Sequence, residues 1–339
     1  MGWKVVHGGK TPPPGEAVAP DERLSWGRTV GFGAQHVVAM FGATFVFPVI
    51  MGLNPNLAIM MSGVATICFL LIVQGKVPSY LGTSASFVGG AAAIYAQGGD
   101  PADVTGAVLV AGVVLALVGL LIHVSGTGVL HRALPPVVTG AVVMLIGFNL
   151  APVVSSVYWP QDQWVALLTM VAVIVMAVGL RGFLGRIAIF LGLVFGYALS
   201  WVFDLFGPVT SVLPGQNLLG PDGEPCATEG PYCVATPFAH DRVDWSGVWK
   251  ADWFGFPPVS DFADGVVGIH APTFSLAFVL LMLPAVIALV AENTGHVKAV
   301  AEMTERDLDP VMGRAIGADG AATVIASAVG GSPTTTYAE

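Results

Sequence analysis

Residues 104–131 read VTGAVLVAGVVLALVGLLIHVSGTGVLH and contain no Lys, Arg, Asp or Glu. A helix needs about 20 consecutive apolar residues to cross the hydrocarbon core of a bilayer, and this stretch is longer than that. Three more stretches lack charged residues in the same way, at 29–75, 77–99 and 133–161. Repeated stretches of this kind predict an all-α membrane protein that crosses the bilayer many times.

The overall composition supports the same class of protein. Of the 339 residues, 55% are hydrophobic and 10% are charged, whereas a soluble domain carries about 25% charged residues. So few charges do not cover the surface of a soluble protein of this size. The chain also has no run of Lys and Arg, which argues against nucleic acid as a partner.

Charge-free stretches, Gly and Pro positions and flanking aromatic residues together predict the individual spans. The predicted helices cover 29–50, 57–75, 104–124, 133–152, 163–180, 187–206, 273–297 and 311–330. Two further segments, 77–97 and the last ten residues, are shorter and rich in Gly, Ser and Thr. With 77–97 counted as a crossing and the amino terminus in the cytoplasm, every Lys and Arg except Arg242 and Lys250 lies inside. This arrangement obeys the positive-inside rule and predicts a multi-pass protein of the inner (plasma) membrane.

The long connection 207–272 is predicted to lie outside the cell. It carries Cys226 and Cys233, which form either a disulfide on that oxidising face or two free thiols. Trp245, Trp249 and Trp253 recur every four residues. This spacing is compatible with a helix that rests on the outer leaflet, or with a loop packed on its own aromatic cluster.

Two ionisable residues in the 273–297 span need a reason to be there, because a charge at the centre of a membrane helix costs about 2.5–3.5 kcal/mol. Glu292 and His296 are four residues apart, so their side chains share one helical face and can hydrogen-bond to each other. A carboxyl group beside an imidazole makes a titratable pair suited to holding or passing a proton. The alternative is a structural polar contact between helices near the cytoplasmic end.

The two Gly/Ser/Thr segments are poor starts for a continuous helix. Gly82-Thr83-Ser84-Ala85-Ser86-Phe87 and Gly330-Gly331-Ser332-Pro333-Thr334-Thr335-Thr336 are each better interpreted as extended backbone that leads into a half-helix. Such breaks occur at membrane depth only where they line a cavity or are buried in protein. A pair of interrupted segments in two repeats indicates the central site of a transporter. Glycine hinges without a binding role remain the alternative.

At these positions the sequence resembles the nucleobase/ascorbate transporter family, most closely its bacterial uracil permeases, which are uracil:proton symporters. Four segments carry the likeness: Gln35–Thr44, Lys76–Ser84, Ala291–His296 and Gly331–Glu339. The resemblance covers the whole chain after residue 25. It implies an inverted seven-plus-seven-span fold with broken spans 3 and 10, of which this chain holds spans 1–9 and the start of span 10.

The resemblance also implies a division of the chain, to which the polar, Pro-rich first residues add a tail. The expected parts are a disordered cytoplasmic tail (1–26), core spans 1–4 (27–131), gate spans 5–7 (132–206), the extracellular loop (207–272) and the incomplete core spans 8–10 (273–339).

The same resemblance implies the roles of individual residues. The residues expected to bind substrate are Glu292, Glu339, Ser84, Ala85, Phe87 and Ala338. Those expected to couple or support proton movement are Glu292, His296, His36 and Tyr337. Uracil permeases commonly carry phenylalanine at the position of Ala85, so the stacking contact with the base is either missing or supplied by Phe87. Related nucleobases therefore remain open as substrates.

The function implied is import of uracil or a related nucleobase by proton symport through alternating access. We expect the nucleobase, protons and the lipid bilayer as partners, no metal or other cofactor, and a homodimer as the candidate assembly. The alternative from another class is an anion channel or sulfate-type carrier on the same fold, although such proteins usually lack the Glu-x-x-x-His pair. An enzyme is not expected, because the spans contain no nucleophile motif or cluster of metal ligands.

Overall fold

The computed structural model describes residues 3–10, 12–13, 16–133, 135–181, 183–213, 217–219, 234–250, 254–262 and 265–337. The chain forms two compact units. The first contains Met1–Gly147 and Phe256–Glu339, and the second contains Phe148–Gly255. Ala338, Glu339, Cys226, Cys233 and Trp253 lie outside the described residues.

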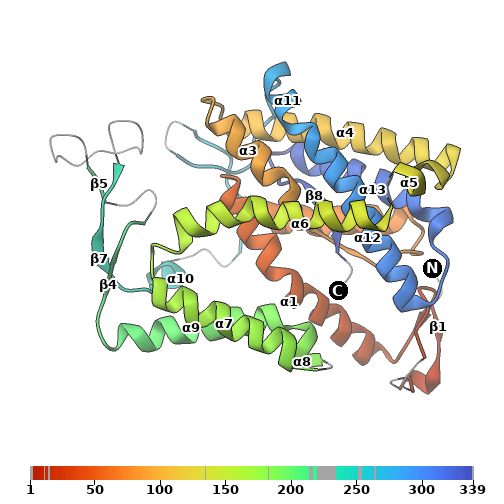
Figure 1. The fold of residues 1–339 in the computed structure, drawn as a ribbon, viewed down its shortest axis with the longest axis horizontal. Helices are drawn as coiled ribbons and strands as arrows, with labels where there is room; N and C mark the ends of the chain where they lie inside the picture. Colours follow the sequence, from red (N-terminus) through yellow and green to blue (C-terminus); the bar gives the residue numbers. More distant parts are fainter. Residues whose placement is uncertain are drawn as a thin grey trace. The chain divides into compact units, whose positions relative to one another are not determined.

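The first unit is built from long helices around a short pair of strands (Figure 1). Its elements in chain order are α1 (Trp26–Ile50), α2 (Pro55–Ile72), β3 (Tyr80–Thr83), α3 (Val88–Tyr95), α4 (Pro101–Ser125), α5 (Gly128–Ala133), α6 (Pro136–Val153, which runs into the second unit), α11 (Leu276–Met282), α12 (Pro284–Thr304), α13 (Asp309–Ser327) and β8 (Thr334–Tyr337). A 3-10 turn, Ala85–Phe87, joins β3 to α3.

Four helical segments of the described chain are long and apolar enough to cross a membrane. They are Trp26–Ile50, Pro55–Ile72, Pro101–Ser125 and Leu276–Thr304, the last counted across α11 and α12. Shorter apolar helices cover Ala85–Tyr95, Gly140–Pro152, Gln163–Gly179 and Ala188–Asp204. The structure therefore confirms the predicted class, a helical membrane protein. One predicted helix, 273–297, is instead interrupted at Leu283 and resumes at Pro284, a residue without an N–H group for an interior helical hydrogen bond.

Local sequence explains where the central helices begin. The Asp100 side chain accepts a hydrogen bond from the backbone of Asp103, the Asp103 side chain reaches back to the backbone of Asp100, and Pro101 follows the cap. This capping box satisfies N–H groups that the first turn of α4 leaves free. The Asn54 side chain caps α2 in the same manner by accepting from the N–H of Leu57.

Small residues allow α4 and α13 to pack with their backbones in close contact. A Cβ atom added at Gly119 would collide with the backbone of Gly317, and one added at Gly320 would collide with the backbone of Ala116. Close approach through Gly and Ala is the usual way in which helices associate in membranes, where the hydrophobic effect between helices is absent. Of this tight pair, α13 also contacts β8.

Part of each segment predicted to be extended is a strand, Gly82–Thr83 in β3 and Thr334–Thr336 in β8, and the two strands pair with each other. β3 and β8 are antiparallel, with Tyr80 opposite Tyr337 and Thr83 opposite Thr334. Helices α1 and α2 contact β3, whereas α12 and α13 contact β8. The strand pair thus lies among these helices of the first unit (Figure 1).

Part of the amino-terminal segment has regular structure. β1 (Lys4–Val5) pairs in parallel with β2 (Glu22–Arg23), and a 3-10 turn covers His7–Gly9. The rings of Trp3 and Trp26 lie 6.1 Å apart, which brings the start of this segment to α1.

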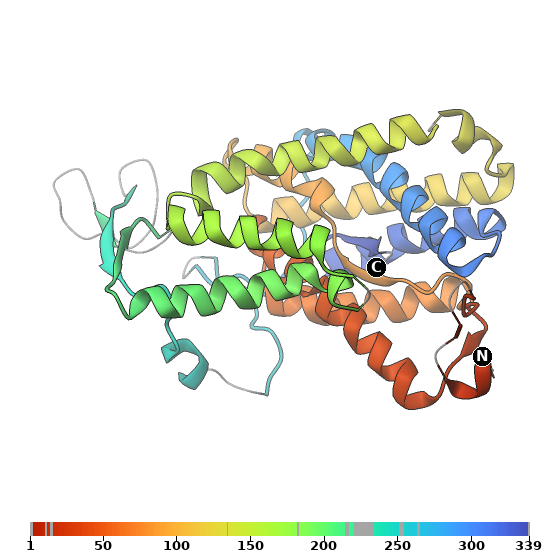
Figure 2. The same ribbon diagram turned by 60° about the horizontal axis from the view of Figure 1, so that its bottom comes forward.

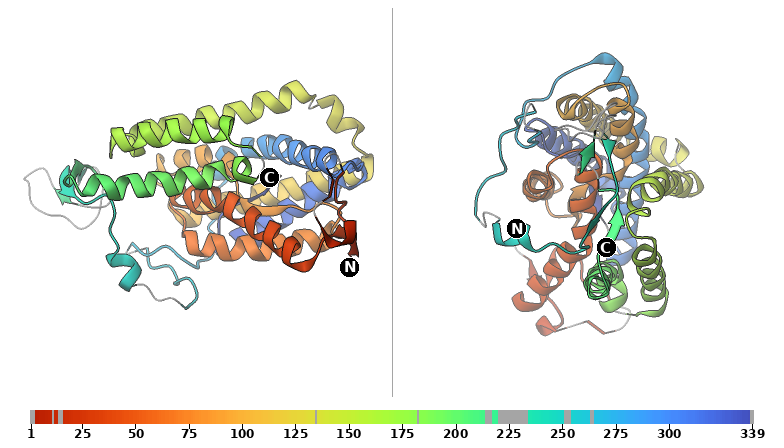
Figure 3. Two further views of the ribbon diagram at one scale, coloured as in Figure 1. Left: turned by 90° about the horizontal axis from the view of Figure 1, so that it is seen from below. Right: turned by 90° about the vertical axis from the view of Figure 1, so that its left-hand side faces the viewer.

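The second unit contains α7 (Gln163–Gly179) and α9 (Ala188–Asp204), which pack side by side and are joined through α8 (Phe183–Arg186) (Figures 2 and 3). A π-helical turn, Val154–Tyr158, precedes α7. Beyond α9 come β4 (Val209–Ser211), β5 (Leu218–Leu219), β6 (Val234–Ala235), β7 (Phe238–His240) and α10 (Ser246–Lys250). β4 pairs with β7, and β5 pairs with β6.

The tryptophan series of this unit is only partly helical in the described chain. Trp249 lies in the five-residue α10, whereas Trp245 precedes it and packs edge-on against Tyr197 at 5.7 Å. This aromatic contact fits a loop packed on its own unit.

Candidate functional site

The two broken segments meet where the first leaves β3 and the second enters β8. The backbone N–H of Ser84 donates to the carbonyl of Pro333 at 3.1 Å, and the hydroxyl groups of Thr83 and Ser332 lie 2.9 Å apart. Ser84 also accepts a hydrogen bond from the N–H of Ser86, which fixes the turn into α3. The N–H that follows β3 and the carbonyl that precedes β8 therefore satisfy each other, as backbone at membrane depth requires.

Glu292 lies on α12 and faces this turn. The Ser86 hydroxyl group donates a hydrogen bond to Oε2 of Glu292 at 2.9 Å. The contact joins the first broken segment to the helix that carries the predicted carboxylate. Glu292 is partly buried in the first unit.

His296 has a different partner from the predicted one. Its Nδ1 lies 3.3 Å from the hydroxyl oxygen of Thr336 on β8, and its ring stacks on that of Tyr337 with centroids 6.1 Å apart. Glu292 and His296 thus share a face of α12, but Glu292 bonds to Ser86 and His296 bonds to β8. The two side chains connect α12 to both broken segments.

A buried polar network, which the sequence alone did not predict, joins α12, α13 and β8 next to these contacts. Asn293 donates through Nδ2 to Asp319 Oδ2 at 2.8 Å, and it accepts through Oδ1 from the hydroxyl of Thr336 at 2.8 Å. The Thr334 hydroxyl donates to Asp319 Oδ1 at 3.0 Å. The side chains of Asn293, Asp319, Thr334 and Thr336 are all buried. Buried polar groups are stable when each is hydrogen-bonded, and these contacts tie α12, α13 and β8 into one arrangement.

The sequence marks Asp319 as unusual, although it does not indicate what this residue does. It is the only charged residue between Arg314 and the end of β8, inside a helix otherwise rich in Gly and Ala. Its partners could not be identified from spacing alone, because Asn293 is 26 positions and Thr334 is 15 positions away.

His36 lies beside the strand pair from α1. Its ring centroid is 6.0 Å from that of Tyr80, the residue opposite Tyr337 in the strand register. The Tyr337 hydroxyl donates to the carbonyl of Thr83 at 2.7 Å. The structure therefore brings His36 to the strands through Tyr80, while its Nε2 is buried without a hydrogen-bond partner.

The remaining predicted ligands differ in accessibility. Ser84 and Phe87 are buried, and Phe87 is only 1% exposed. Gly82 leaves no room for a larger residue, since an added Cβ would lie 2.9 Å from the Thr44 hydroxyl and 2.8 Å from the Tyr337 ring. Ala85 belongs to the 3-10 turn that follows Ser84. Together these residues make a close junction between β3, its half-helix and α12.

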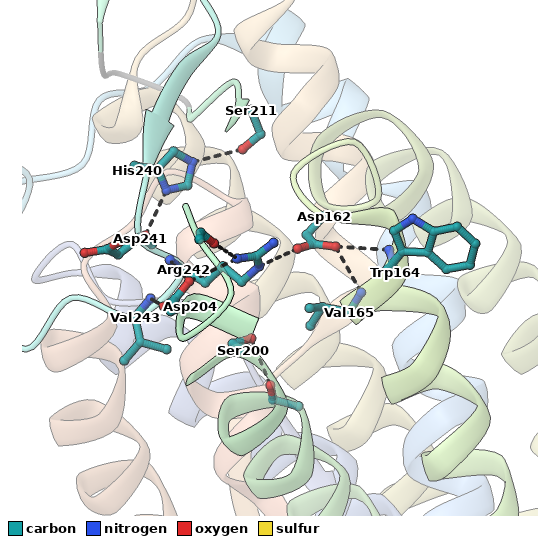
Figure 4. Close-up of polar contacts among 12 residues, drawn as sticks. Asp162, Trp164, Val165, Ser200, Asp204, Ser211, His240, Asp241, Arg242 and Val243 are labelled. Atoms are coloured by element: carbon teal, nitrogen blue, oxygen red, sulfur yellow. Dashed lines mark hydrogen bonds and ion pairs between the residues drawn. The ribbon is translucent and has the colours of Figure 1, made fainter. Parts of the chain in front are cut away.

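The second unit has a separate charged cluster centred on Arg242 (Figure 4). Its Nε lies 2.5 Å from Asp162 Oδ2, and its Nη1 lies 3.1 Å from Asp204 Oδ1. Asp204 also accepts from the backbone N–H groups of Arg242 and Val243. Asp162 in turn caps α7 by accepting from the N–H groups of Trp164 and Val165.

One cation thus holds the segment after β7 to the start of α7 and the end of α9. The carboxylates of Asp162 and Asp204 compensate its charge, and the three side chains are only 13–15% exposed. Among the residues that the structure describes, no group of three or more His, Cys, Asp or Glu side chains is placed to hold a metal ion.

The model of the Permease family (Xan_ur_permease) matches residues 27–339. The chain is 43% identical over 329 residues to the Escherichia coli K12 protein named "Putative pyrimidine permease RutG", covering 95% of this chain and 65% of that protein. It is 32% identical to the uracil permease of Bacillus subtilis, covering 93% of this chain and 66% of the relative.

The uracil permease of Escherichia coli K12 is 30% identical over 335 residues. The chain spans about two thirds of the length of these relatives. All three bear the names of transporters rather than enzymes, as predicted. The match over nearly the whole chain and the apolar helices agree: this membrane protein belongs to the permease family of nucleobase/ascorbate transporters.

Proposed function

We propose that this protein transports uracil or a related nucleobase across the membrane together with a proton, by alternating access. The observation that carries the proposal is the hydrogen bond from Ser86 to Glu292, which places a carboxyl group at the junction of two broken segments. The names of the relatives, uracil permease and pyrimidine permease, support this class of substrate.

The chemistry of the junction suits a pyrimidine. Uracil presents N–H donors and carbonyl acceptors along the edge of a planar, uncharged ring. The Glu292 carboxylate accepts from a ring N–H, while backbone groups of Ser84, Ala85 and Ala338 bind the remaining polar edge. Phe87 supplies an apolar surface for the ring, and Glu339 is a second carboxylate ligand. A carboxylate at this position repels anions, which disfavours an anion channel or sulfate-type carrier.

Proton coupling follows from the two forms of Glu292. The protonated acid donates to a carbonyl of the base, whereas the carboxylate accepts from a ring N–H. Substrate affinity then depends on whether the proton is bound, and linkage makes proton affinity depend on substrate in return. His296 and Tyr337 support this exchange by holding α12 against β8, and His36 contributes from α1.

In this proposal the predicted core and gate domains have different roles. Residues 27–131 and 273–339 form the core that carries the substrate, and residues 132–206 form part of the gate. Motion of core against gate exposes the site to one side and then the other. The protein works in the inner membrane with its amino terminus in the cytoplasm, as a homodimer.

Uptake of labelled uracil by cells that express the full-length gene product tests the proposal. We expect saturable uptake that a protonophore abolishes and that other pyrimidines inhibit by competition. Uptake that persists undiminished after the proton gradient is collapsed would contradict symport. Failure of uracil, and of every nucleobase tried as a competitor, to bind the purified protein would contradict the substrate class.

A further inference from the structure

His270 lies in the irregular segment that leads from Phe256 to α11, within the first unit. Its Nδ1 is 2.8 Å from the carbonyl oxygen of Gly268 and 3.1 Å from the Ser260 hydroxyl. Its Nε2 is 3.1 Å from the hydroxyl of Thr105, a fully buried residue of α4. A carbonyl oxygen only accepts, so Nδ1 carries the hydrogen and donates it to Gly268. The ring therefore fastens its own segment to α4.

The same ring lies against Gly330, where α13 turns toward β8. Gly330 has a φ of +88°, and a Cβ added there would lie 2.5 Å from His270 Nδ1 and 2.7 Å from its Cε1. The backbone N–H of His270 donates to the carbonyl of Val329, the residue before Gly330, at 3.2 Å. The turn into β8 thus depends on glycine for its conformation and for the space that the imidazole occupies.

The rest of the segment is also fastened to the first unit. The Thr273 N–H donates to the carbonyl of Ala102 at 3.0 Å, and its hydroxyl donates to Asp103 Oδ1 at 2.6 Å. The Asn54 side chain donates to the carbonyl of Val267 at 2.8 Å. The segment is consequently held at the beginnings of both α2 and α4, and His270 is the member that reaches the α13–β8 turn.

From these contacts we propose that His270 is a positioning residue that fixes the start of β8, and with it the substrate site. The proposal rests on the proposed function only in taking β8 as one side of that site. β8 supplies Thr334 and Thr336, whose hydroxyl groups bond to Asp319 and Asn293. A turn released at Gly330 lets those hydroxyl groups move away from their partners, although His270 itself does not touch the substrate.

Two measurements on the full-length protein in detergent test the proposal. The first is hydrogen–deuterium exchange of the backbone amides from Gly330 to Tyr337, which needs no ligand. The second is uracil affinity by calorimetry. His270→Ala should raise exchange in that segment and weaken uracil binding about tenfold, the effect of one lost hydrogen-bond-sized interaction. Exchange in α7 and α9 of the second unit should not change.

Companion variants separate positioning from loss of fold. His270→Asn keeps a donor near Gly268 and should restore part of the affinity, whereas Thr105→Val removes only the Nε2 partner and should cause a smaller defect. His123→Ala, at an exposed position near the end of α4, is the matched control. If His270→Ala unfolds the protein, Thr105→Val carries the test.

Unchanged exchange from Gly330 to Tyr337 in a folded His270→Ala or Thr105→Val variant would overturn the positioning role. Absence of uracil binding by the unmodified protein would instead count against the proposed function, because the exchange result does not depend on the ligand. Local exchange that rises while affinity stays the same would show that the turn is held by His270 but that the substrate site does not depend on it, which also overturns the inference.

Discussion

The Ser86 hydroxyl group donates a 2.9 Å hydrogen bond to Oε2 of Glu292, across 206 positions of sequence. The contact joins the turn after β3 to α12, and His296 joins the next turn of α12 to Thr336 of β8. The carboxyl group therefore has an orientation set by the protein before any substrate arrives. Preorganisation of this kind reduces the entropic cost of binding.

Removal of the Ser86 hydroxyl tests this orientation. In Ser86→Ala the Glu292 carboxyl group loses the hydrogen bond from the Ser86 hydroxyl, and we expect uracil affinity to fall about tenfold with the fold intact. Calorimetry on the purified full-length protein measures the affinity. Ser125→Ala, which removes an exposed hydroxyl that donates to the Leu121 carbonyl of its own helix, is the control. Equal affinity of Ser86→Ala and the control would show that the Ser86 contact has no part in binding.

Asp319 should matter for stability. Asp319→Ala removes the carboxylate that accepts from the Asn293 amide and from the Thr334 hydroxyl. Asn293 keeps its bond to the Leu289 carbonyl and Thr334 keeps its contact with the Thr323 hydroxyl, so the expected loss is about 1–3 kcal/mol, the cost of one unpaired buried donor. Asp319→Asn keeps one acceptor oxygen and should be less destabilising. The melting temperatures of the two variants in detergent test this prediction. An Asp319→Ala protein with the same melting temperature as the wild type would show that the network does not stabilise the fold.

Arg242 should stabilise the second unit. Arg242→Gln leaves the carboxylates of Asp162 and Asp204 without their cation. The ion pairs are only partly buried, so we expect a loss of about 1–3 kcal/mol, below the roughly 3–5 kcal/mol typical of a fully buried ion pair. Arg242→Lys keeps the charge but cannot bond to Asp162 and Asp204 through separate nitrogens, so an intermediate loss is expected. Arg181→Gln, at an exposed position of the same unit, should be nearly neutral. If Arg242→Gln melts no lower than Arg181→Gln, the cluster does not stabilise this unit.

The contact between α4 and α13 should tolerate no added side chain. In Gly119→Ala the new methyl group meets the backbone of Gly317, and overpacking of this kind costs about 1–3 kcal/mol. Gly63→Ala is the matched control, because a Cβ there has nothing within 4 Å. Melting temperatures in detergent separate the two, and equal values would mean that the helices can move apart without cost.

The sequence predicts the long elements of the fold well, for a physical reason. A helix in a membrane must be apolar along its length, so the charge-free stretch 104–131 identifies α4, observed at Pro101–Ser125. Gly82 and Gly330 mark the breaks because glycine and small polar residues disfavour a continuous helix. Gly82 lies within β3, and Gly330 lies in the turn that precedes β8.

Side-chain partners could be predicted only in part. The spacing of Glu292 and His296 places both on one face, but which group each one bonds to depends on neighbours brought together by the fold. The bonds from Ser86 to Glu292 and from Asn293 to Asp319 join residues 206 and 26 positions apart. No periodicity within one helix carries that information.

The central claim is that Glu292 both binds the nucleobase and links its transport to a proton. Its most direct test is uracil accumulation in proteoliposomes of the full-length protein, with and without an imposed pH gradient, comparing wild type with Glu292→Gln. Glutamine keeps the shape and hydrogen-bonding capacity of the side chain but cannot titrate. The account predicts that Glu292→Gln still binds and exchanges uracil but no longer accumulates it when the gradient is applied. Accumulation by Glu292→Gln to the wild-type level would contradict the account.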